Sequence, residues 1–300
     1  MSFLRCAAAL SACLAVAVFP TVPAAAEPAG TGAAVIVLGD SYSANSAEIA
    51  YEPSPCAHGA TSWPTQVGRR LGIAGTADLL DLSCSGGAVD TPPGWTLLHQ
   101  ARKAAAANAF GPATRVITLQ AGMNDAWGAN SVTMIHAFTE CLLNLVSGCG
   151  LDAPAQNRLP DYLGVTAENL AQRVRAIVEY AKYYAPAARI VLVGYPEIWP
   201  SGGTSACIDV AGLGRVTQPR AEGVIAYFDA LDRAQRGAAE LLGIDFLDTR
   251  GLTAGHGLCS AEPLVNGVLD PRTDLTGIPA HPSGRGDALV AEALIRRAGL

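Results

Sequence analysis

The sequence carries little charge of either sign. Only 15% of its 300 residues are charged, and 20 basic against 26 acidic side chains give a formal net charge of −6. Lysine is nearly missing, with Lys103 and Lys182 alone. Because no basic run exists that could neutralise a phosphate backbone, we expect no nucleic-acid partner. The hydrophobic share of 50% excludes a disordered or fibrous chain.

Beyond residue 26 the sequence also lacks an apolar run of about 18 residues, the length that spans a bilayer. The early apolar stretch at residues 6–19 follows Arg5, and three alanines precede Glu27. This order is typical of a secretory signal peptide. A lipoprotein cleavage box at Cys13 is the alternative, but the apolar run after this cysteine is stronger than the run before it. We expect a signal peptide at residues 1–26, cleaved near Ala26, and a secreted protein without a membrane span.

No Cys-x-x-Cys pair occurs among the eight cysteines, and no histidine lies at a metal-ligand spacing from them. We therefore expect neither a metal nor another cofactor. Six cysteines remain beyond the expected signal peptide: Cys56, Cys84, Cys141, Cys149, Cys207 and Cys259. An even number in an exported chain predicts disulfide bonds. The sequence leaves the pairing open, and sequential pairing is our preference because each bond then closes a local loop.

Five apolar runs with β-branched content predict buried strands, at residues 33–38, 79–82, 116–119, 190–193 and 244–247. Five helical patterns accompany them, at residues 62–71, 97–109, 166–184, 219–242 and 282–297. Strands that alternate with helices pair in parallel and have helices on both faces. The sequence predicts one α/β domain over residues 27–300, a three-layer α/β/α sandwich on a five-stranded parallel sheet. Residues 127–164 are an expected insertion of undetermined shape.

Short polar stretches follow three of the predicted strands. Ser41 lies in Gly-Asp-Ser after the first strand, Gly86 in Ser-Gly-Gly after the second, and Asn124 in Gly-Met-Asn-Asp after the third. Each stretch alone fits an ordinary turn or helix cap. Ligands of such a sheet bind at the carboxyl ends of the strands, where the three stretches come together. Their conjunction indicates a site with an exposed serine, a glycine N–H and an amide side chain.

The sequence favours His281 as the base that completes this site. It stands just before the last predicted helix, and the loop after the fifth strand can fold back over the carboxyl edge of the sheet. His99 and His136 belong to helical patterns instead. His256, between two glycines, is the main competitor. A serine beside a histidine is the arrangement of nucleophilic catalysis.

These stretches resemble the SGNH branch of the GDSL esterase and lipase superfamily, with Ser41, Gly86, Asn124 and His281 at its four hallmark positions. The resemblance covers essentially all of the chain after residue 26 and extends to the cysteine spacing of secreted actinobacterial lipases. It implies a flavodoxin-like sandwich and ester hydrolysis through an acyl-enzyme without a metal. Ser41, Gly86 and Asn124 would form the oxyanion hole. The implied disulfides are Cys56 with Cys84, Cys141 with Cys149, and Cys207 with Cys259.

The sequence departs from the family pattern at one position. Most members carry Asp-x-x-His-Pro, whereas Ile278 stands three residues before His281. The backbone carbonyl of Ile278 is our first candidate to orient the histidine, and Asp274 and Asp270 are the alternatives. Without a carboxylate beside the imidazole, we expect activity to fall as the pH drops through about 6.5.

The natural substrate does not follow from the sequence. A small-molecule ester, a lipid ester or an acylated glycan of the cell envelope would each fit, and Trp95, Trp127 and Trp199 either line an acyl groove or pack loops. We expect a monomer. An acyltransferase and a carbohydrate acetyl esterase remain alternative functions. A non-catalytic binding protein on the same scaffold is a third, against which the joint presence of the four hallmark residues argues.

Overall fold

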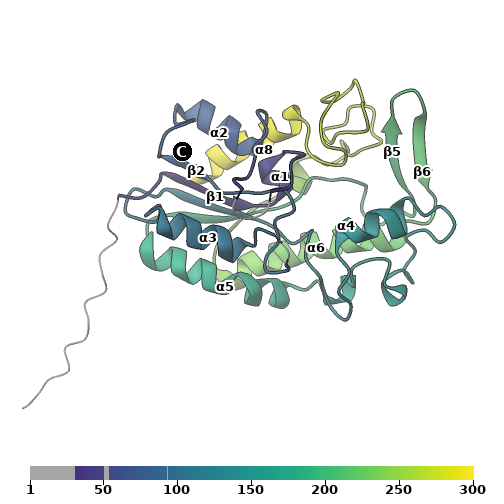
Figure 1. Ribbon diagram of the computed structural model, residues 1–300, viewed down its shortest axis with the longest axis horizontal. Coiled ribbons are helices and arrows are strands. Elements are labelled where there is room, and N and C mark those ends of the chain that lie inside the picture. Colours follow the sequence, from purple (N-terminus) through teal and green to yellow (C-terminus); the bar gives the residue numbers. More distant parts are fainter. Residues whose placement is uncertain (1–30, 51–53, 93) are drawn as a thin grey trace, which may run out of the picture.

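A five-stranded parallel sheet lies at the centre of the computed structural model, which describes residues 31–50, 54–92 and 94–300 (Figure 1). The strand order is β2-β1-β3-β4-β7. The strands are β1 (Val35–Gly39), β2 (Leu79–Asp81), β3 (Val116–Gln120), β4 (Arg189–Val193) and β7 (Asp245–Leu247), and all neighbours pair in parallel. Because helices cover both faces, β1 and β3 are buried along their whole length. The predicted strands and their parallel pairing are confirmed.

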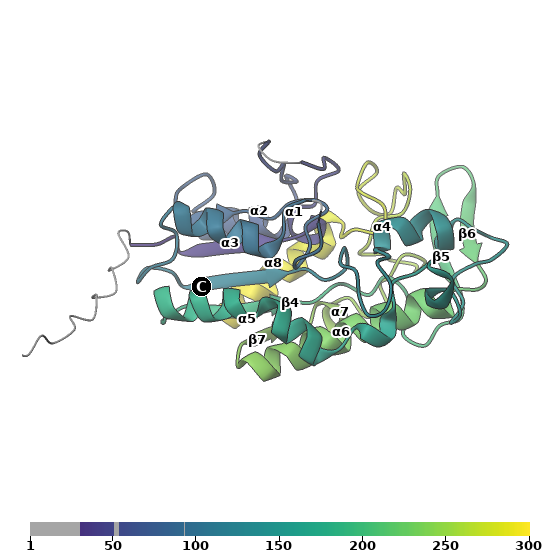
Figure 2. The same cartoon turned by 60° about the horizontal axis from the view of Figure 1, so that its bottom comes forward.

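Successive residues of β1 point to opposite faces and so belong to two separate cores. Val35 and Val37 pack under α2 (Trp63–Leu71) and α8 (Gly284–Ala298), whereas Ile36 and Leu38 face the opposite layer. That layer contains α3 (Leu97–Ala106), α5 (Ala167–Tyr184) and α6 (Glu222–Leu242) (Figures 1 and 2). The predicted sandwich is therefore correct. Side-chain caps at Ser62, Thr96, Thr166 and Ser283 start four of these helices close to the predicted positions.

Two parts of the fold did not follow from the sequence. Residues 127–164 contain only short elements, namely α4 (Met134–Ala137), a π-helical turn (Phe138–Leu142) and 3₁₀ turns at Pro154–Gln156 and Tyr162–Gly164. A separate antiparallel hairpin joins β5 (Ala206–Val210) to β6 (Gly214–Gln218). Its sequence signal is a turn with Gly212 and Gly214 at φ of 76° and 75°. The hairpin was missed because most of its residues are polar or exposed.

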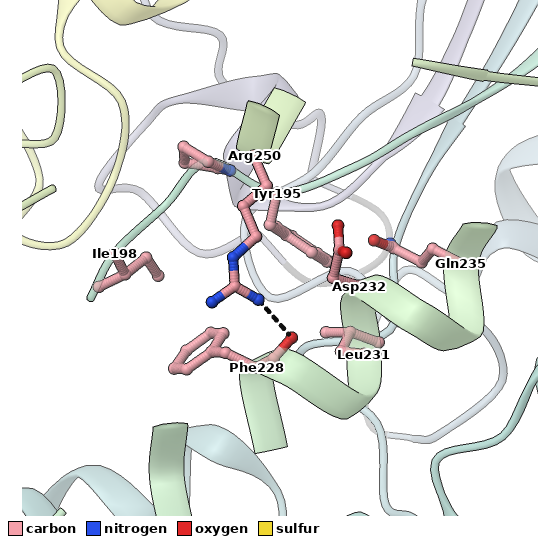
Figure 3. Close-up of a pocket in the computed structure, with 8 residues that line it drawn as sticks. Tyr195, Ile198, Phe228, Leu231, Asp232, Gln235 and Arg250 are labelled. Carbon is pink, nitrogen blue, oxygen red and sulfur yellow. Dashed lines mark hydrogen bonds between the residues drawn. The ribbon is translucent and has the colours of Figure 1, made fainter. Parts of the chain in front are cut away.

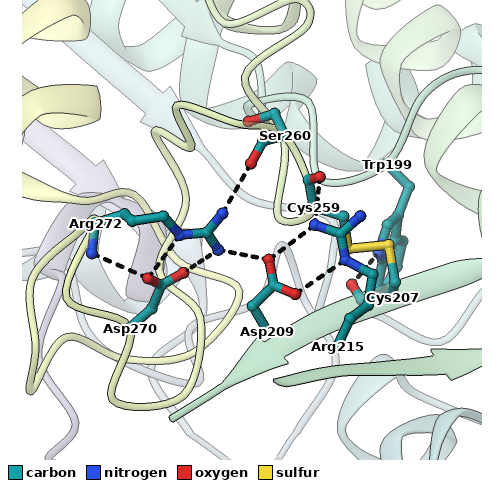
Figure 4. The surroundings of a disulfide bond; sticks show 8 residues. All are labelled: Trp199, Cys207, Asp209, Arg215, Cys259, Ser260, Asp270 and Arg272. Atoms are coloured by element: carbon teal, nitrogen blue, oxygen red, sulfur yellow. Dashed lines mark hydrogen bonds and ion pairs between the residues drawn. A yellow bond between two sulfur atoms is a disulfide. The ribbon is translucent and has the colours of Figure 1, made fainter.

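Three disulfide bonds join the described cysteines in the sequential pairing that the family resemblance implied. The bond between Cys207 and Cys259 ties the hairpin to the long loop between the short helix α7 (Thr249–Leu252) and α8. Next to it, Asp209 accepts hydrogen bonds from Arg215 and Arg272, and Arg272 also binds Asp270 (Figure 4). This network fastens the loop that carries His281 to the rest of the fold.

The expected signal peptide lies outside the described residues. None of the helices in the described part of the chain is long and apolar enough to cross a bilayer.

Candidate active site

Ser41 lies just after the carboxyl end of β1, which lies between β2 and β3 in the sheet. This is the topological switch point, where the strand order reverses and ligands of such sheets bind. It is the first residue of the single-turn helix α1 (Ser41–Ala44), and Asp40 caps this helix by accepting the N–H of Tyr42 at 2.8 Å. The turn requires a glycine before it, because a Cβ on Gly39 would lie 2.4 Å from Oγ of Ser43. As a first helical residue, Ser41 keeps its own N–H outside the hydrogen bonding of α1.

His281 lies at hydrogen-bonding distance from this serine. Its Nε2 is 2.8 Å from Oγ of Ser41, and its Nδ1 is 3.0 Å from the backbone carbonyl of Pro279. A carbonyl oxygen can only accept, so Nδ1 carries the proton and Nε2 is free to accept the serine hydroxyl. Of the four hallmark residues, Ser41 and His281 are the furthest apart in the sequence, yet their side chains are in direct contact.

The group that faces Nδ1 differs from the one expected. The carbonyl of Ile278 accepts the backbone N–H of His281 at 3.1 Å, and the carbonyl within hydrogen-bonding distance of Nδ1 is that of Pro279. Asp274 accepts the N–H of Gly284 at 2.7 Å, and Asp270 is paired with Arg272. The orienting carbonyl is therefore that of Pro279, one residue later than the sequence interpretation placed it.

Burial lowers the pKa of His281 to about 4. The hydrogen bond to Pro279 raises this pKa, but by less than burial lowers it. The imidazole is consequently neutral at pH 7, with a lone pair on Nε2 directed at Oγ of Ser41. The sequence suggested an ordinary value near 6.5, because the apolar surroundings of the ring cannot be read from its neighbours in the chain.

Gly86 and Asn124 lie in the turns that follow β2 and β3. Gly86 has a φ of 81°, and the next residue, Gly87, packs so closely that a Cβ would lie 2.8 Å from the carbonyl oxygen of Gly39. The Asn124 side chain donates one N–H to the carbonyl of Gly87 at 2.8 Å. Since an amide has two N–H donors, this bond uses one of them. The structure thus brings the turns after β1, β2 and β3 together, as the sequence predicted.

Asp125 fixes the relative position of these turns. Its carboxylate is fully buried and accepts the N–H of Val89 at 2.8 Å and that of Asp90 at 3.2 Å, and it forms an ion pair with Arg173. Burial raises the pKa of Asp125, and Arg173 opposes this effect. Asp125 thus binds loop N–H groups and Arg173, and in this way it stabilises the loops around Asn124.

Asp40 has a similar structural position. Its second carboxylate oxygen accepts the hydroxyl of Tyr195 at 2.5 Å. Burial raises the pKa of Asp40 to about 7, even though Tyr195 and the N–H of Tyr42 favour the charged form. The carboxyl group is turned inward to these partners, and it holds the first turn of α1 in place.

A small cavity near the carboxyl end of β4 is separate from this site (Figure 3). It lies between Tyr195, Ile198 and α6, and the guanidinium of Arg250 closes part of it by bonding to the carbonyl of Phe228. None of the four hallmark residues is among the described residues that line it.

The three tryptophans considered as acyl-groove residues lie inside the fold: Trp95, Trp127 and Trp199 are all buried. Their burial fits the packing of loops, and Trp127 also lines a second cavity together with Asp90 and Arg173.

One side chain at the site had no sequence signal. Ile49, in the loop after α1, is 52% exposed, and its Cγ2 lies 3.6 Å from the point where a Cβ on Gly86 would stand. Ser85 donates its hydroxyl to the carbonyl of Ser46, and this bond holds the same loop beside the glycines. Ile49 thus offers an apolar surface next to Gly86.

Comparisons with known proteins show the family to which the chain belongs. Residues 37–289 match the GDSL-like lipase/acylhydrolase family. The chain is 30% identical over 278 residues to Lipase 2 of Streptomyces coelicolor, which covers 88% of this chain and 85% of the relative. It is 27% identical over 300 residues to a lipase of Streptomyces rimosus, with 96% of each chain covered.

Two solved structures show the same fold. Phospholipase A1 from Streptomyces albidoflavus NA297 aligns with a TM-score of 0.62 at 20% identity, over 89% of this chain and 99% of that one. The extracellular lipase of Streptomyces rimosus aligns with a TM-score of 0.60 at 22% identity, over 90% of this chain and 100% of that one.

Proposed function

Since the chain belongs to the GDSL-like lipase/acylhydrolase family and is a carboxylic ester hydrolase, we propose that Ser41 is its nucleophile and His281 its general base. The observation that carries this proposal is the 2.8 Å distance between Nε2 of His281 and Oγ of Ser41. The neutral imidazole accepts the hydroxyl proton while Oγ attacks the ester carbonyl. The hydrogen bond from Nδ1 to Pro279 keeps the ring in the required tautomer throughout.

Attack forms a tetrahedral intermediate with a negative charge on the former carbonyl oxygen. The N–H groups of Ser41 and Gly86 and the amide of Asn124 stabilise this charge, because all three turns lie at the same edge of the sheet. Collapse of the intermediate transfers the proton from Nε2 to the departing alcohol and leaves an acyl group on Ser41. Water, activated by the same imidazole, then releases the acid and restores the serine.

We propose that the preferred substrates are esters with an apolar acyl chain. The support is local: the exposed side chain of Ile49 lies next to Gly86, where the ester carbonyl would bind. The names of the similar proteins, lipases and a phospholipase A1, fit this class. An acyltransferase or a glycan acetyl esterase would use the same serine, so product analysis with and without an acceptor alcohol or an acetylated glycan separates them.

We propose further that the protein is a secreted monomer, released by cleavage near Ala26. The disulfide bonds support export, because they form and persist in oxidising compartments. Cleavage at this position would leave residues 27–300, which we propose to form a single catalytic domain. N-terminal sequencing of protein recovered from culture medium and gel filtration test these statements.

The nucleophile is tested with p-nitrophenyl esters from acetate to palmitate and with a serine-reactive fluorophosphonate probe. The wild-type protein should hydrolyse the esters and bind the probe covalently. Ser41→Ala should do neither while its far-ultraviolet circular dichroism stays unchanged. Ser131→Ala is the matched control, since Ser131 is an exposed serine of the insertion at residues 127–164. Full activity of Ser41→Ala would refute the proposal.

A further inference from the structure

The imidazole of His281 lies flat on the ring of Tyr42. The two ring centroids are 4.4 Å apart and the ring planes differ by 25°. Tyr42 follows Ser41 directly in α1, so the serine and the platform beneath the histidine share one helical turn. The ring of Tyr42 is 2% exposed, and Tyr195 packs against it edge-on at 4.9 Å. The platform therefore has little freedom to move.

The hydroxyl of Tyr42 makes a second connection to the same histidine. It donates to the backbone carbonyl of Ala280 at 2.7 Å across 238 positions of sequence. Ala280 has a φ of 63°, a left-handed conformation that a residue with a Cβ rarely adopts. Ala280 stands between Pro279 and His281, so its backbone angles set where the Pro279 carbonyl lies relative to Nδ1. The hydroxyl thus holds the segment that supplies the orienting carbonyl.

Serine hydrolases with a carboxylate beside the histidine fix the plane and tautomer of the ring with one side chain. Here the tautomer depends on a carbonyl of a loop, and the plane of the ring needs separate support. We propose that Tyr42 is the positioning residue of His281: its ring fixes the plane of the imidazole, and its hydroxyl fixes the turn that carries the Pro279 carbonyl. This inference rests on the proposed roles of Ser41 and His281.

The surroundings keep the Tyr42 hydroxyl a donor. Burial raises the pKa of Tyr42 well above its ordinary value, and the carboxyl of Asp40 adds to this effect. The titratable groups around the ring are Asp40 at the start of α1, Tyr195 after β4, Tyr227 of α6 and His281 itself. Asp287 of α8 is directed at Asn45 at the other end of α1. The hydrogen bond to Ala280 therefore persists over the pH range in which the enzyme would be assayed.

Two substitutions separate the roles of the hydroxyl and the ring. Tyr42→Phe keeps the ring but removes the bond to Ala280, so kcat on p-nitrophenyl butyrate should fall about 10-fold with KM unchanged. Its acid limb in a plot of kcat/KM against pH should stay in place, since the ring still covers the imidazole. Tyr42→Ala also admits water to the imidazole, so its acid limb should move upward toward about pH 6.5. Tyr42→Phe suffices for the test if Tyr42→Ala does not fold.

Tyr162→Phe is the matched control, because the Tyr162 hydroxyl also donates to a backbone carbonyl, that of Leu151, within the insertion at residues 127–164. Wild-type kcat in Tyr42→Phe, an equal loss in Tyr162→Phe, or a change in KM alone would each overturn the positioning role. Ser41→Ala is assayed beside them. If it is active, the proposed function fails; if it is inactive while Tyr42→Phe keeps its kcat, only the inference about Tyr42 fails.

Discussion

Nε2 of His281 lies 2.8 Å from Oγ of Ser41, although 240 positions separate the two residues in the sequence. Ser41 follows β1, which lies inside the sheet between β2 and β3, and His281 precedes α8, which packs beside α2 on one face. The pair therefore forms only when the early and late parts of the chain are both in place. Activity and global folding should be lost together on denaturation.

The amide of Asn124 should contribute mainly to the chemical step. Asn124→Ala removes a donor to the developing oxyanion, so we expect kcat to fall about 100-fold with a smaller change in KM. Asn169→Ala is the control, since its amide also donates to a backbone carbonyl, that of Gly164, at the start of α5. Steady-state kinetics with thermal unfolding of both variants makes the comparison. A similar kcat in the two variants would contradict the role of Asn124 in the oxyanion hole.

The pH profile should reflect the buried state of His281. Its pKa is lowered to about 4, and the base must be neutral, so kcat/KM should hold from pH 7 to about pH 5 and fall only through about pH 4. A series of kcat/KM values in overlapping buffers, with reversibility checked after each acid incubation, measures this. A midpoint near pH 6.5 would mean that the imidazole is hydrated in solution.

Asp40 should make the fold less stable as the pH rises. Its folded pKa is about 7 and its ordinary value is 3.8, so between these values the native state binds the proton more tightly than the unfolded state. The free energy of unfolding then declines from about pH 4 to pH 7, by at most about 4 kcal/mol from this group.

Asp40→Asn removes this titration and keeps an acceptor for the N–H of Tyr42. Urea unfolding at several pH values should show a flatter profile for the variant than for the wild type. The buried carboxyl group of Asp287 remains in both proteins and cancels in the difference. Asp125, whose charge raises the pKa of Asp40, also remains in both proteins and loses a charged neighbour in the variant. Parallel profiles would show that Asp40 is hydrated or charged in the native state.

Ile49 should influence the choice of acyl chain. Ile49→Ser removes apolar surface beside Gly86, so kcat/KM for p-nitrophenyl octanoate should fall about 10-fold relative to acetate. Ile135→Ser changes an isoleucine of similar exposure on α4 and should leave the ratio unaltered. If the two variants give the same ratio, Ile49 does not contact the chain.

The sequence predicted the parts of the site that depend on strand ends. Runs such as Val-Ile-Val-Leu and Val-Ile-Thr-Leu are apolar without alternation, which is the pattern of strands buried on both faces, and the polar turns after them must meet at one edge. It predicted a main-chain carbonyl beside His281 but placed it at Ile278 instead of Pro279, because a hydrogen bond to a main-chain oxygen leaves no mark on residue identity. The hairpin of β5 and β6 escaped notice for another reason: β5 is only partly buried and β6 is mostly exposed, so no apolar periodicity marks it.

The carbonyl that faces Nδ1 of His281 belongs to the main chain of residue 279. An aspartate in the same role can be lost through a single codon change, whereas a peptide oxygen is present whichever amino acid occupies the position. Natural variation can therefore disconnect the imidazole from this partner only by altering the course of the loop, through an insertion, a deletion or a change in the residues that bend it.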